Sequence, residues 1–446
     1  MTMVGYELVR SDDGLAMSTD PIGKRLNEIE EGGSGKFSQW KDDRRSDQPA
    51  SGRGSRLVSL DVFRGITVAL MIMVDDAGSF SPAINHSPWN GVTIADFVMP
   101  FFLFIVGVSL GLAYKNVTDR IAATRKAVLR ALKLFIMGLI LQGGFFHGVR
   151  NLTFGVDLLN IRLMGVLQRI AVAYLFVAMC EVWLRSNVLV NSGYSMLKRY
   201  RLQLFVGGLL TELYMVLLYG LLVPDWQYEI PDKDSIPKLY FVNCGVRGDT
   251  SPACNVVGML DRKILGINHL YRHPVYGRTK QCSINSPYNG PLPPDAPPWC
   301  EAPFDPEGLL STVMAVVTCL IGLHFGHVIL HFKDHKDRIF QWIVPSFCLL
   351  ALTFFLDFCG MVMNKSLYTL SYTFYTAGAA GLLFAVLYLL VDVYNYRRLT
   401  YVMEWMGKHA LMIYVLIACN ILPIFIHGFY WKEPKNNLLR LVGIGA

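Results

Sequence analysis

Long apolar runs separated by short polar segments organise most of the chain. A helix needs about 20 largely apolar residues to cross a bilayer. Nine such stretches follow residue 56, at 57–76, 94–114, 127–146, 163–184, 202–224, 307–331, 339–361, 367–393 and 401–427. The pattern predicts an all-α polytopic membrane protein, a bundle of about nine transmembrane helices surrounded by the lipid bilayer.

Two polar regions flank or interrupt this pattern. Residues 1–55 are rich in Ser, Gly, Asp and Arg and contain no apolar run of signal-sequence length, which predicts a disordered tail. Residues 225–306 form one long loop rich in Pro, Gly and Asn, a length that is uncommon unless the loop is functional. The predicted organisation is therefore the tail, five helices in 56–224, the loop, and four helices with a short tail in 307–446.

The distribution of Lys and Arg predicts the orientation in the membrane. Basic loops follow every second predicted span, the first of them carrying Lys115, Arg120, Arg125 and Lys126, whereas residues 77–93 contain no Lys or Arg. Because basic loops stay in the cytosol, the amino terminus is predicted to be cytosolic and the segments 77–93 and 225–306 lumenal. The net charge of +7 thus reflects topology, and no nucleic-acid partner is expected.

Cysteine usage agrees with this topology. Of nine cysteines, four lie in the long loop, namely Cys244, Cys254, Cys282 and Cys300. An even cluster on an oxidising side indicates two disulfides in one of three pairings. Free thiols or a zinc site are the alternatives, although no C-x-x-C spacing is present. The Asn364-Lys-Ser sequence is a glycosylation sequon on the predicted lumenal side.

The segment joining the first two spans concentrates polar chemistry at the predicted lumenal boundary. Imidazole titrates near neutrality, and a nearby carboxylate can fix its tautomer, so a His among acids is typical of a general base or a nucleophile. A hydrated loop histidine is the competing interpretation. The side chains concerned are Asp75, Asp76, His86, Trp89, Asn90 and Asp96.

A second group, Arg162, Gln168 and Arg169, brackets the start of the fourth predicted span. An Arg inside an apolar helix needs an anionic partner. The sequence leaves two partners open for Arg169, the phosphate of a coenzyme or a structural carboxylate.

Two further sets of ionisable residues lie within predicted spans, where such residues suggest function. Asp61 and Arg64 share one helical face, as a structural ion pair or a catalytic one. His324, His327 and His331 also share a face, which would allow metal binding but has no acidic partner close in sequence.

Several segments together carry a resemblance. Residues 56–65 (RLVSLDVFRG) and 86–96 (HSPWNGVTIAD) resemble the heparan-alpha-glucosaminide N-acetyltransferase family, and so, in the same order, do GVLQR at 165–169, LDR at 260–262, HLYRH at 269–273 and FDPEG at 304–308. The Asp75-Asp76 pair, where the animal enzymes have Asn in place of Asp75, is more similar to plant-type members.

The resemblance implies a multi-pass enzyme of an endomembrane (lysosome or vacuole, Golgi or ER) that moves acetyl from cytosolic acetyl-CoA to an amine or hydroxyl of a lumenal, amino-sugar-like acceptor. It implies that His86 is the base or the acetyl carrier and that Asp75 supports it. Substrate contacts are then expected from Asp76, Trp89, Asn90 and Asp96, coenzyme contacts from Arg162, Gln168 and Arg169, and no metal is required.

A secondary transporter of a polar or sugar-like solute is the alternative function. Intramembrane charges and helices interrupted by glycines such as Gly138, Gly143 and Gly144 suit that class too. No internal repeat relates the two halves of the chain, and the polar residues gather at one loop, which favours the enzyme. The sequence is compatible with a homodimer but does not fix the oligomeric state.

Overall fold

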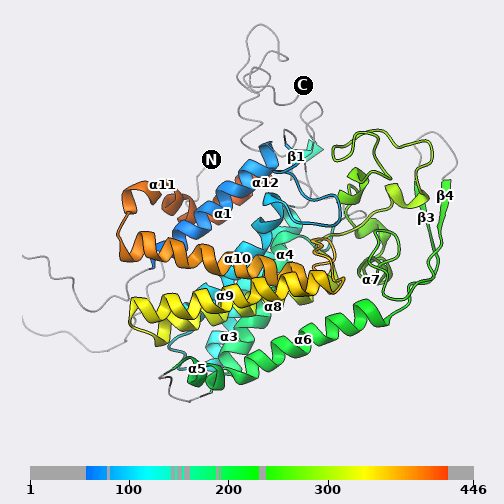
Figure 1. Cartoon of the computed structure of the whole chain (residues 1–446). Coiled ribbons are helices and arrows are strands. Elements are labelled where there is room, and N and C mark those ends of the chain that lie inside the picture. Colours follow the sequence, from blue (N-terminus) through cyan, green and yellow to red (C-terminus); the bar gives the residue numbers. More distant parts are fainter. Residues whose placement is uncertain are drawn as a thin grey trace, which may run out of the picture. The chain divides into compact units, whose positions relative to one another are not determined.

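The computed structural model describes residues 57–77, 81–141, 146–147, 153–154, 161–186, 190, 192–230 and 238–419. The predicted tail 1–55 and the sequence after residue 419 lie outside this range. Helices dominate the described part (Figure 1). The helices are α1 Val58–Ala77, α2 Val98–Ala113, α3 Arg120–Ile140, α4 Val166–Trp183, α5 Gly193–Arg199, α6 Arg201–Gly220, α7 Val256–Ile264, α8 Leu309–His331, α9 His335–Phe358, α10 Leu370–Tyr388, α11 Arg397–Lys408 and α12 Ala410–Ala418.

Six helices in the described part are long and apolar enough to cross a membrane. They are Ile94–Ala113, which joins a short 3-10 turn to α2, then α4, α6, α8, α9 and Leu370–Val393, in which α10 continues as a π-helical turn. These six agree with six of the nine predicted spans. The structure therefore confirms a mainly helical, polytopic membrane protein.

The other three predicted spans are also helical, but they are not among the six candidate membrane helices of the described part. The region 57–76 is α1. Helix α3 begins seven residues before the predicted 127, because the Asp119 side chain accepts hydrogen bonds from the amides of Ile121 and Ala122 and so caps the helix. The predicted span 401–427 is broken at His409 between α11 and α12. The total of nine spans stays a prediction.

The backbones of helices α2 and α8 are in close contact through glycines spaced four residues apart. An ideal Cβ on Gly107 would lie 2.1 Å from the carbonyl oxygen of Cys319, and one on Gly322 would lie 2.2 Å from that of Phe104. Gly111 and Gly326 repeat the arrangement one turn further along. Small residues at this spacing let the helix backbones touch, which is the main source of helix association in membranes.

Replacement of Gly107 by Ala should therefore lower stability by about 1–3 kcal/mol, because the new methyl group has to displace backbone atoms. Gly208→Ala is the matched control, since an ideal Cβ at Gly208 has no atom within 4 Å. Thermal unfolding in detergent measures both variants. Equal melting temperatures for the two variants would contradict the proposed role of this contact.

The long loop contains the antiparallel hairpin of β3 Trp226–Ile230 and β4 Lys238–Val242, followed by α7. Two disulfides, Cys244–Cys254 and Cys282–Cys300, join cysteines that are adjacent in sequence order, so both predicted disulfides are present in the structure and the pairing is resolved. A second hairpin, β1 Phe146–His147 with β2 Thr153–Phe154, lies between α3 and α4.

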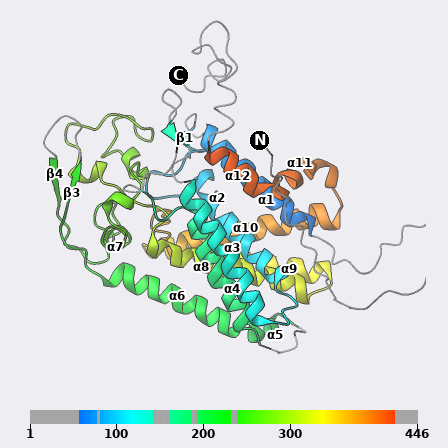
Figure 2. The same ribbon diagram turned by 180° about the vertical axis from the view of Figure 1, so that it is seen from behind.

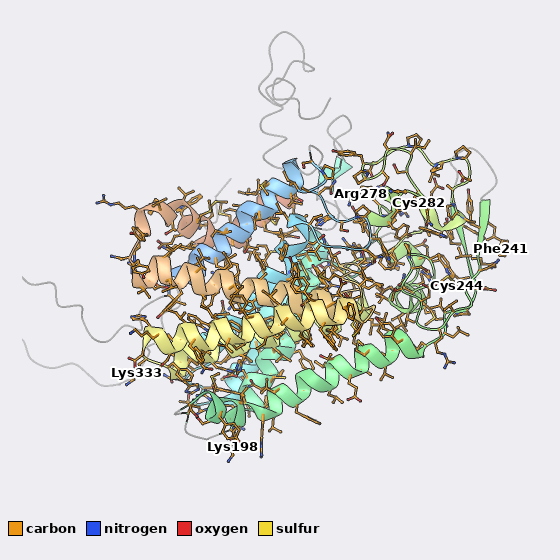
Figure 3. The ribbon with its side chains drawn as sticks, in the orientation of Figure 1. Lys198, Phe241, Cys244, Arg278, Cys282 and Lys333 are labelled. Carbon is orange, nitrogen blue, oxygen red and sulfur yellow. A yellow bond between two sulfur atoms is a disulfide. The ribbon has the colours of Figure 1, made fainter. Side chains whose placement is uncertain are left out.

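The two ends of the helical bundle differ in chemistry. Lys198 and Lys333 lie at one end, here called the basic end, and Cys244, Cys282 and Arg278 lie at the other, here called the loop end (Figure 3). This separation agrees with the predicted topology, in which basic loops and disulfides occupy opposite faces of the membrane. The sidedness itself stays a prediction.

Candidate functional site

The segment between α1 and α2 folds around the carboxylate of Asp96, whose side chain is fully buried. One oxygen, Oδ2, accepts hydrogen bonds from the backbone amides of Ser87 (3.2 Å) and Thr93 (3.0 Å) and from the Thr93 hydroxyl (2.9 Å). The Thr93 amide and hydroxyl bonds belong to the cap of the 3-10 turn Ile94–Phe97. The other oxygen, Oδ1, lies 2.8 Å from Nδ1 of His86. The loop is thus folded so that Asp96 has one oxygen left for His86.

His86 and Asp96 form a three-membered cluster with Lys365. The Lys365 Nζ lies 2.8 Å from Nδ1 and 3.3 Å from Nε2 of His86, and 3.5 Å from Oδ1 of Asp96. A proton on Nδ1 that is donated to Asp96 leaves Nε2 as the basic nitrogen of the imidazole. The cluster therefore contains a base, a carboxylate that orients it, and a cation beside both.

Lys365 was not among the residues predicted for the site. The lysine is brought to His86 by a β-bridge between Asn90 and Asn364, in which the Gly91 amide donates to the carbonyl of Met363 (2.9 Å). The Asn364 side chain is buried, donating to Asn90 Oδ1 (3.4 Å) and accepting from the Leu367 amide. This packing leaves no room for a glycan on the Asn364 sequon.

Two cavities meet at this cluster. The larger, with a volume of about 1050 Å³, is lined mainly by the long loop, including Tyr271, Arg272 and Glu301. The smaller, about 320 Å³, lies among α1, α2, α4 and α12 and has mostly apolar walls, including Met71, Phe102 and Ile417. The residues common to both linings are Asp75, His86, Val166, Glu307 and Lys365. His86 therefore contacts two spaces at once, the larger with mixed polar and apolar walls and the smaller more apolar.

Comparison with known proteins shows similarity to one enzyme family. The family model for the catalytic region of heparan-alpha-glucosaminide N-acetyltransferase matches residues 56–224, which include His86 and Asp96. The heparan-alpha-glucosaminide N-acetyltransferase of Mus musculus is 28% identical over 411 residues, and that of Homo sapiens is 29% identical over 421 residues. The chain is thus similar to the heparan-alpha-glucosaminide N-acetyltransferases.

These alignments cover 86% and 87% of this chain but only 56% and 57% of the mouse and human proteins. The chain thus spans somewhat more than half the length of the two relatives.

The environment of His86 favours its neutral form. Burial, and next the positive charge of Lys365, lower the pKa of His86 below its ordinary value of 6.5, and the hydrogen bond and charge of Asp96 only partly oppose this. An imidazole that stays neutral into mildly acidic solution remains able to accept a proton there.

The acid limb of the pH–rate profile should consequently lie below pH 6.5. Neutral His86 is the active form of a base, and it is lost as pH falls through the lowered pKa. In Lys365→Met one cause of the lowering is removed, so the limb should move to higher pH whatever happens to the maximal rate. Measurement of kcat/KM for the acceptor from pH 4 to 8 checks both expectations. An unchanged limb in Lys365→Met would show that Lys365 does not act on His86.

The other residues predicted for the site differ in their contacts with this cluster. Asp75 is exposed and lines both cavities, but the carboxylate 2.8 Å from His86 is that of Asp96. Trp89 is buried, donates from Nε1 to the carbonyl of Thr250 (3.0 Å) and packs against Phe304, so it holds the long loop in place. The side chain of Asp76 lies outside the described part.

The three predicted coenzyme residues are held by the loop before α8. Arg162 lines the larger cavity and pairs with both Asp305 and Glu307. Arg169 is 2% exposed and lines neither cavity, since its guanidinium donates to the Ser311 hydroxyl and to the carbonyl of Pro306 (3.2 Å).

Gln168 is also buried, with its side chain beside Gly138. A coenzyme contact of Arg162, Gln168 and Arg169 stays a prediction, and their geometry gives it no support.

The remaining ionisable pairs lie apart from the cluster. Arg64 pairs with Asp61 (3.1 Å) and donates to the Ser109 hydroxyl (3.2 Å), which is the structural ion pair considered from sequence. The His327 ring lies 2.9 Å from the carboxylate of Glu181, a partner 146 residues away in the chain. Neither pair lines the two cavities.

Proposed function

We propose that the protein is a transmembrane acetyltransferase that moves acetyl from acetyl-CoA to an amine or hydroxyl of an amino-sugar-like acceptor. The observation that carries the proposal is the meeting of two cavities at His86 and Lys365, beside the buried Asp96, in a chain similar to N-acetyltransferases. Transfer of an acetyl group between two substrates requires a place at which both substrates reach the same base.

The chemistry follows from the positions of the three side chains. Nε2 of His86 takes the proton of the acceptor amine or hydroxyl as it attacks the thioester carbonyl, while Asp96 keeps the proton on Nδ1 and stabilises the imidazolium. The ammonium of Lys365 stabilises the negative charge that forms on the carbonyl oxygen. Collapse of the tetrahedral intermediate breaks the carbon–sulfur bond, and the proton on His86 passes to the departing thiolate.

A second route with the same residues begins with His86 as the nucleophile. Nε2 of His86 would then take the acetyl group first and pass it to the acceptor, which gives ping-pong kinetics. The larger cavity suits a sugar acceptor because it has polar as well as apolar walls and lies in the long loop. The smaller one suits the acyl end of the donor because its walls are mostly apolar and it lies among helices.

The proposed topology places the long loop in the lumen of an endomembrane compartment and the amino terminus in the cytosol. The donor would then come from the cytosolic side and the acceptor from the lumenal side. The concentration of disulfides at the loop end and of lysines at the basic end supports this orientation (Figure 3).

Proteoliposomes incubated with acetyl-labelled acetyl-CoA and a panel of amino sugars test the function. We expect labelled acetyl on at least one amino sugar, with release of one coenzyme A per acetyl transferred. Uptake of a sugar that does not depend on coenzyme A would instead identify a transporter and contradict the proposal.

A further inference from the structure

Arg278 is a buried arginine that reaches the backbone of the candidate base. It ends the 3-10 turn Val275–Arg278 of the long loop, which lies beside the segment that joins α1 to α2 (Figure 2). Its Nη2 donates a hydrogen bond to the carbonyl oxygen of His86 at 2.9 Å. In the described part of the chain, no other group donates to this carbonyl. The long loop is thus bonded directly to the residue at which the two cavities meet.

The charge of Arg278 has no ion-pair partner within the described ranges. The residue is 6% exposed and lines the larger cavity, yet none of the ion pairs between described residues includes it. Burial lowers the pKa of Arg278, and the charge of Asp96 only partly opposes this. An apolar side chain would fill such a place at lower cost in free energy. Packing of the loop alone therefore does not explain an arginine here.

The peptide unit between His86 and Ser87 is held at both of its polar atoms. Because a peptide is planar, its carbonyl and its amide move as one body and point in opposite directions. Arg278 binds the carbonyl, and Oδ2 of Asp96 accepts from the Ser87 amide at 3.2 Å. Oδ1 of the same carboxylate lies 2.8 Å from the imidazole. Two charge-assisted contacts therefore fix the backbone from which the His86 ring projects, and Asp96 also fixes the ring.

A second contact sets the position of the 3-10 turn on this segment. Tyr276 packs edge-to-face on Trp89, with the ring centroids 5.9 Å apart. These residues lie two positions before Arg278 and three positions after His86. The Tyr276 hydroxyl donates to the carbonyl of Ala302, which ties the turn to the end of the long loop. The turn is thus docked at an apolar and a polar point, and only the polar point acts on His86.

The Cys282–Cys300 disulfide holds the chain that follows Arg278. It closes residues 282–300 into a covalent ring, here called the disulfide ring, whose two cysteines are buried. Arg278 and Cys282 both lie at the loop end (Figure 3). Within the ring, the Ser286 hydroxyl donates to the carbonyl of Arg278 at 2.8 Å. The backbone of Arg278 is therefore bonded to the disulfide ring while its side chain is bonded to His86.

We propose that Arg278 is a positioning residue for His86 and that the disulfide ring holds Arg278 in place. The inference rests on the proposed function, in which Nε2 of His86 must face the reacting atoms. A base that is misplaced by about 1 Å can lose about 10²-fold in rate. Arg278 takes no part in bond making or breaking, and it acts only through the peptide that carries the imidazole.

Arg278→Ala should lower kcat for acetyl transfer about 10–100-fold, by loss of a charge-assisted contact to the backbone of the base. KM for acetyl-CoA should stay nearly constant. The acid limb of the pH–rate profile should also stay in place, because burial and the charges of Lys365, Asp96 and Glu307 set the pKa of His86. Steady-state kinetics in proteoliposomes measure all three properties.

Rescue by guanidinium separates positioning from a general loss of structure. The shortened side chain opens a space on the larger cavity, where a free guanidinium ion can donate to the His86 carbonyl. Millimolar guanidinium should restore part of the lost kcat, and tetramethylammonium, a cation without a hydrogen-bond donor, should not. Arg247→Ala is the matched control, at an exposed arginine of the same loop outside both cavity linings, and should behave as wild type with either ion.

Paired serine substitutions test the role of the disulfide ring. Cys282→Ser with Cys300→Ser should lower kcat but add little to the loss in Arg278→Ala, because both changes act on the same contact. Cys244→Ser with Cys254→Ser removes the other disulfide of the loop, and its effect should add to that of Arg278→Ala. Additive effects in both series would overturn the role of the disulfide ring.

A wild-type kcat in Arg278→Ala, or a loss that guanidinium leaves unchanged, would overturn the inference. If Arg278→Ala does not fold, Arg278→Lys replaces it. Lysine keeps the charge but not the planar fork, so kcat should fall by a smaller factor at constant KM, and an unchanged kcat would again overturn the inference.

Reaction of His86 with diethyl pyrocarbonate gives a readout without acetyl transfer. Mass spectrometry of the peptide that contains His86 should show faster modification in Arg278→Ala than in wild type, because the ring is less firmly held. If this difference is found although the wild-type protein transfers no acetyl, the proposed function fails while the positioning role of Arg278 stands. Equal rates of modification in the two proteins would count against that role.

Discussion

His86→Ala should reduce acetyl transfer by at least about 10²–10⁴-fold, the usual contribution of a general base, and below detection if His86 also carries the acetyl group. The reason is geometric, since His86 lies where the two cavities meet, and a proton on Nδ1 that is donated to Asp96 leaves Nε2 as the base. Coenzyme A should still bind, because His86 lies in the proposed place of the acyl end of the donor and not of its nucleotide end. Labelled transfer in proteoliposomes and thermal stabilisation by coenzyme A measure the two properties.

His335→Ala is the matched control for this substitution. His335 is an exposed histidine at the start of α9, outside both cavity linings, and should retain wild-type transfer. Near-normal turnover in His86→Ala would refute its catalytic role. Loss of coenzyme A stabilisation together with transfer would show that the substitution damages the fold, and a conservative His86→Gln variant would then have to separate the two effects.

The general fold could be predicted from sequence because the signal is local. A run of about 20 apolar residues indicates a membrane helix without knowledge of its neighbours, and six of the predicted spans are present as candidate membrane helices in the structure. The break at His409 gives no such signal, since it lies where α11 packs on α1. An ideal Cβ on Gly407 would lie only 1.8 Å from the Asp61 carbonyl oxygen, a contact between helices far apart in the chain.

The site could be predicted only where its residues share one segment. His86 and Asp96 are ten residues apart, so both were candidates, although their direct contact was not foreseen. Lys365 is 279 residues from His86 and looks like an ordinary loop charge. Its position depends on the bridge between Asn90 and Asn364, which is a product of tertiary packing.

The buried arginines illustrate the same limit. An anionic partner was expected for Arg169, either a coenzyme phosphate or a structural carboxylate, but the hydrogen bonds of its guanidinium go to neutral oxygens. The structure supplies Ser311 and the carbonyl of Pro306, 142 and 137 residues away. Conversely, Arg130 and Lys133 lie inside the predicted span 127–146, and the packing of α3 along α4 agrees with that position.

Asp96→Asn should have a larger effect than Asp75→Asn, because only Asp96 holds the His86 tautomer. In the variant, the donors at Ser87 and Thr93 still require an oxygen at the Oδ2 position. The amide nitrogen of Asn is thereby directed to the Oδ1 position, where it donates to Nδ1 of His86. The proton must then move to Nε2, and the imidazole can no longer act as the base.

Wrong-tautomer substitutions of this type cost about 10⁴-fold in the serine-protease triad, and we expect a loss of about 10³–10⁴-fold in kcat for Asp96→Asn. The fold should survive because the three hydrogen bonds to Oδ2 are kept, so melting temperature and coenzyme A binding should stay close to wild type. Asp75→Asn should retain partial activity, since Asp75 lines the cavities without being the carboxylate at Nδ1. Steady-state kinetics of the two variants decide between the carboxylates. An inactive Asp75→Asn beside an active Asp96→Asn would transfer the supporting role to Asp75 and would require an arrangement of the α1–α2 segment different from the one seen here.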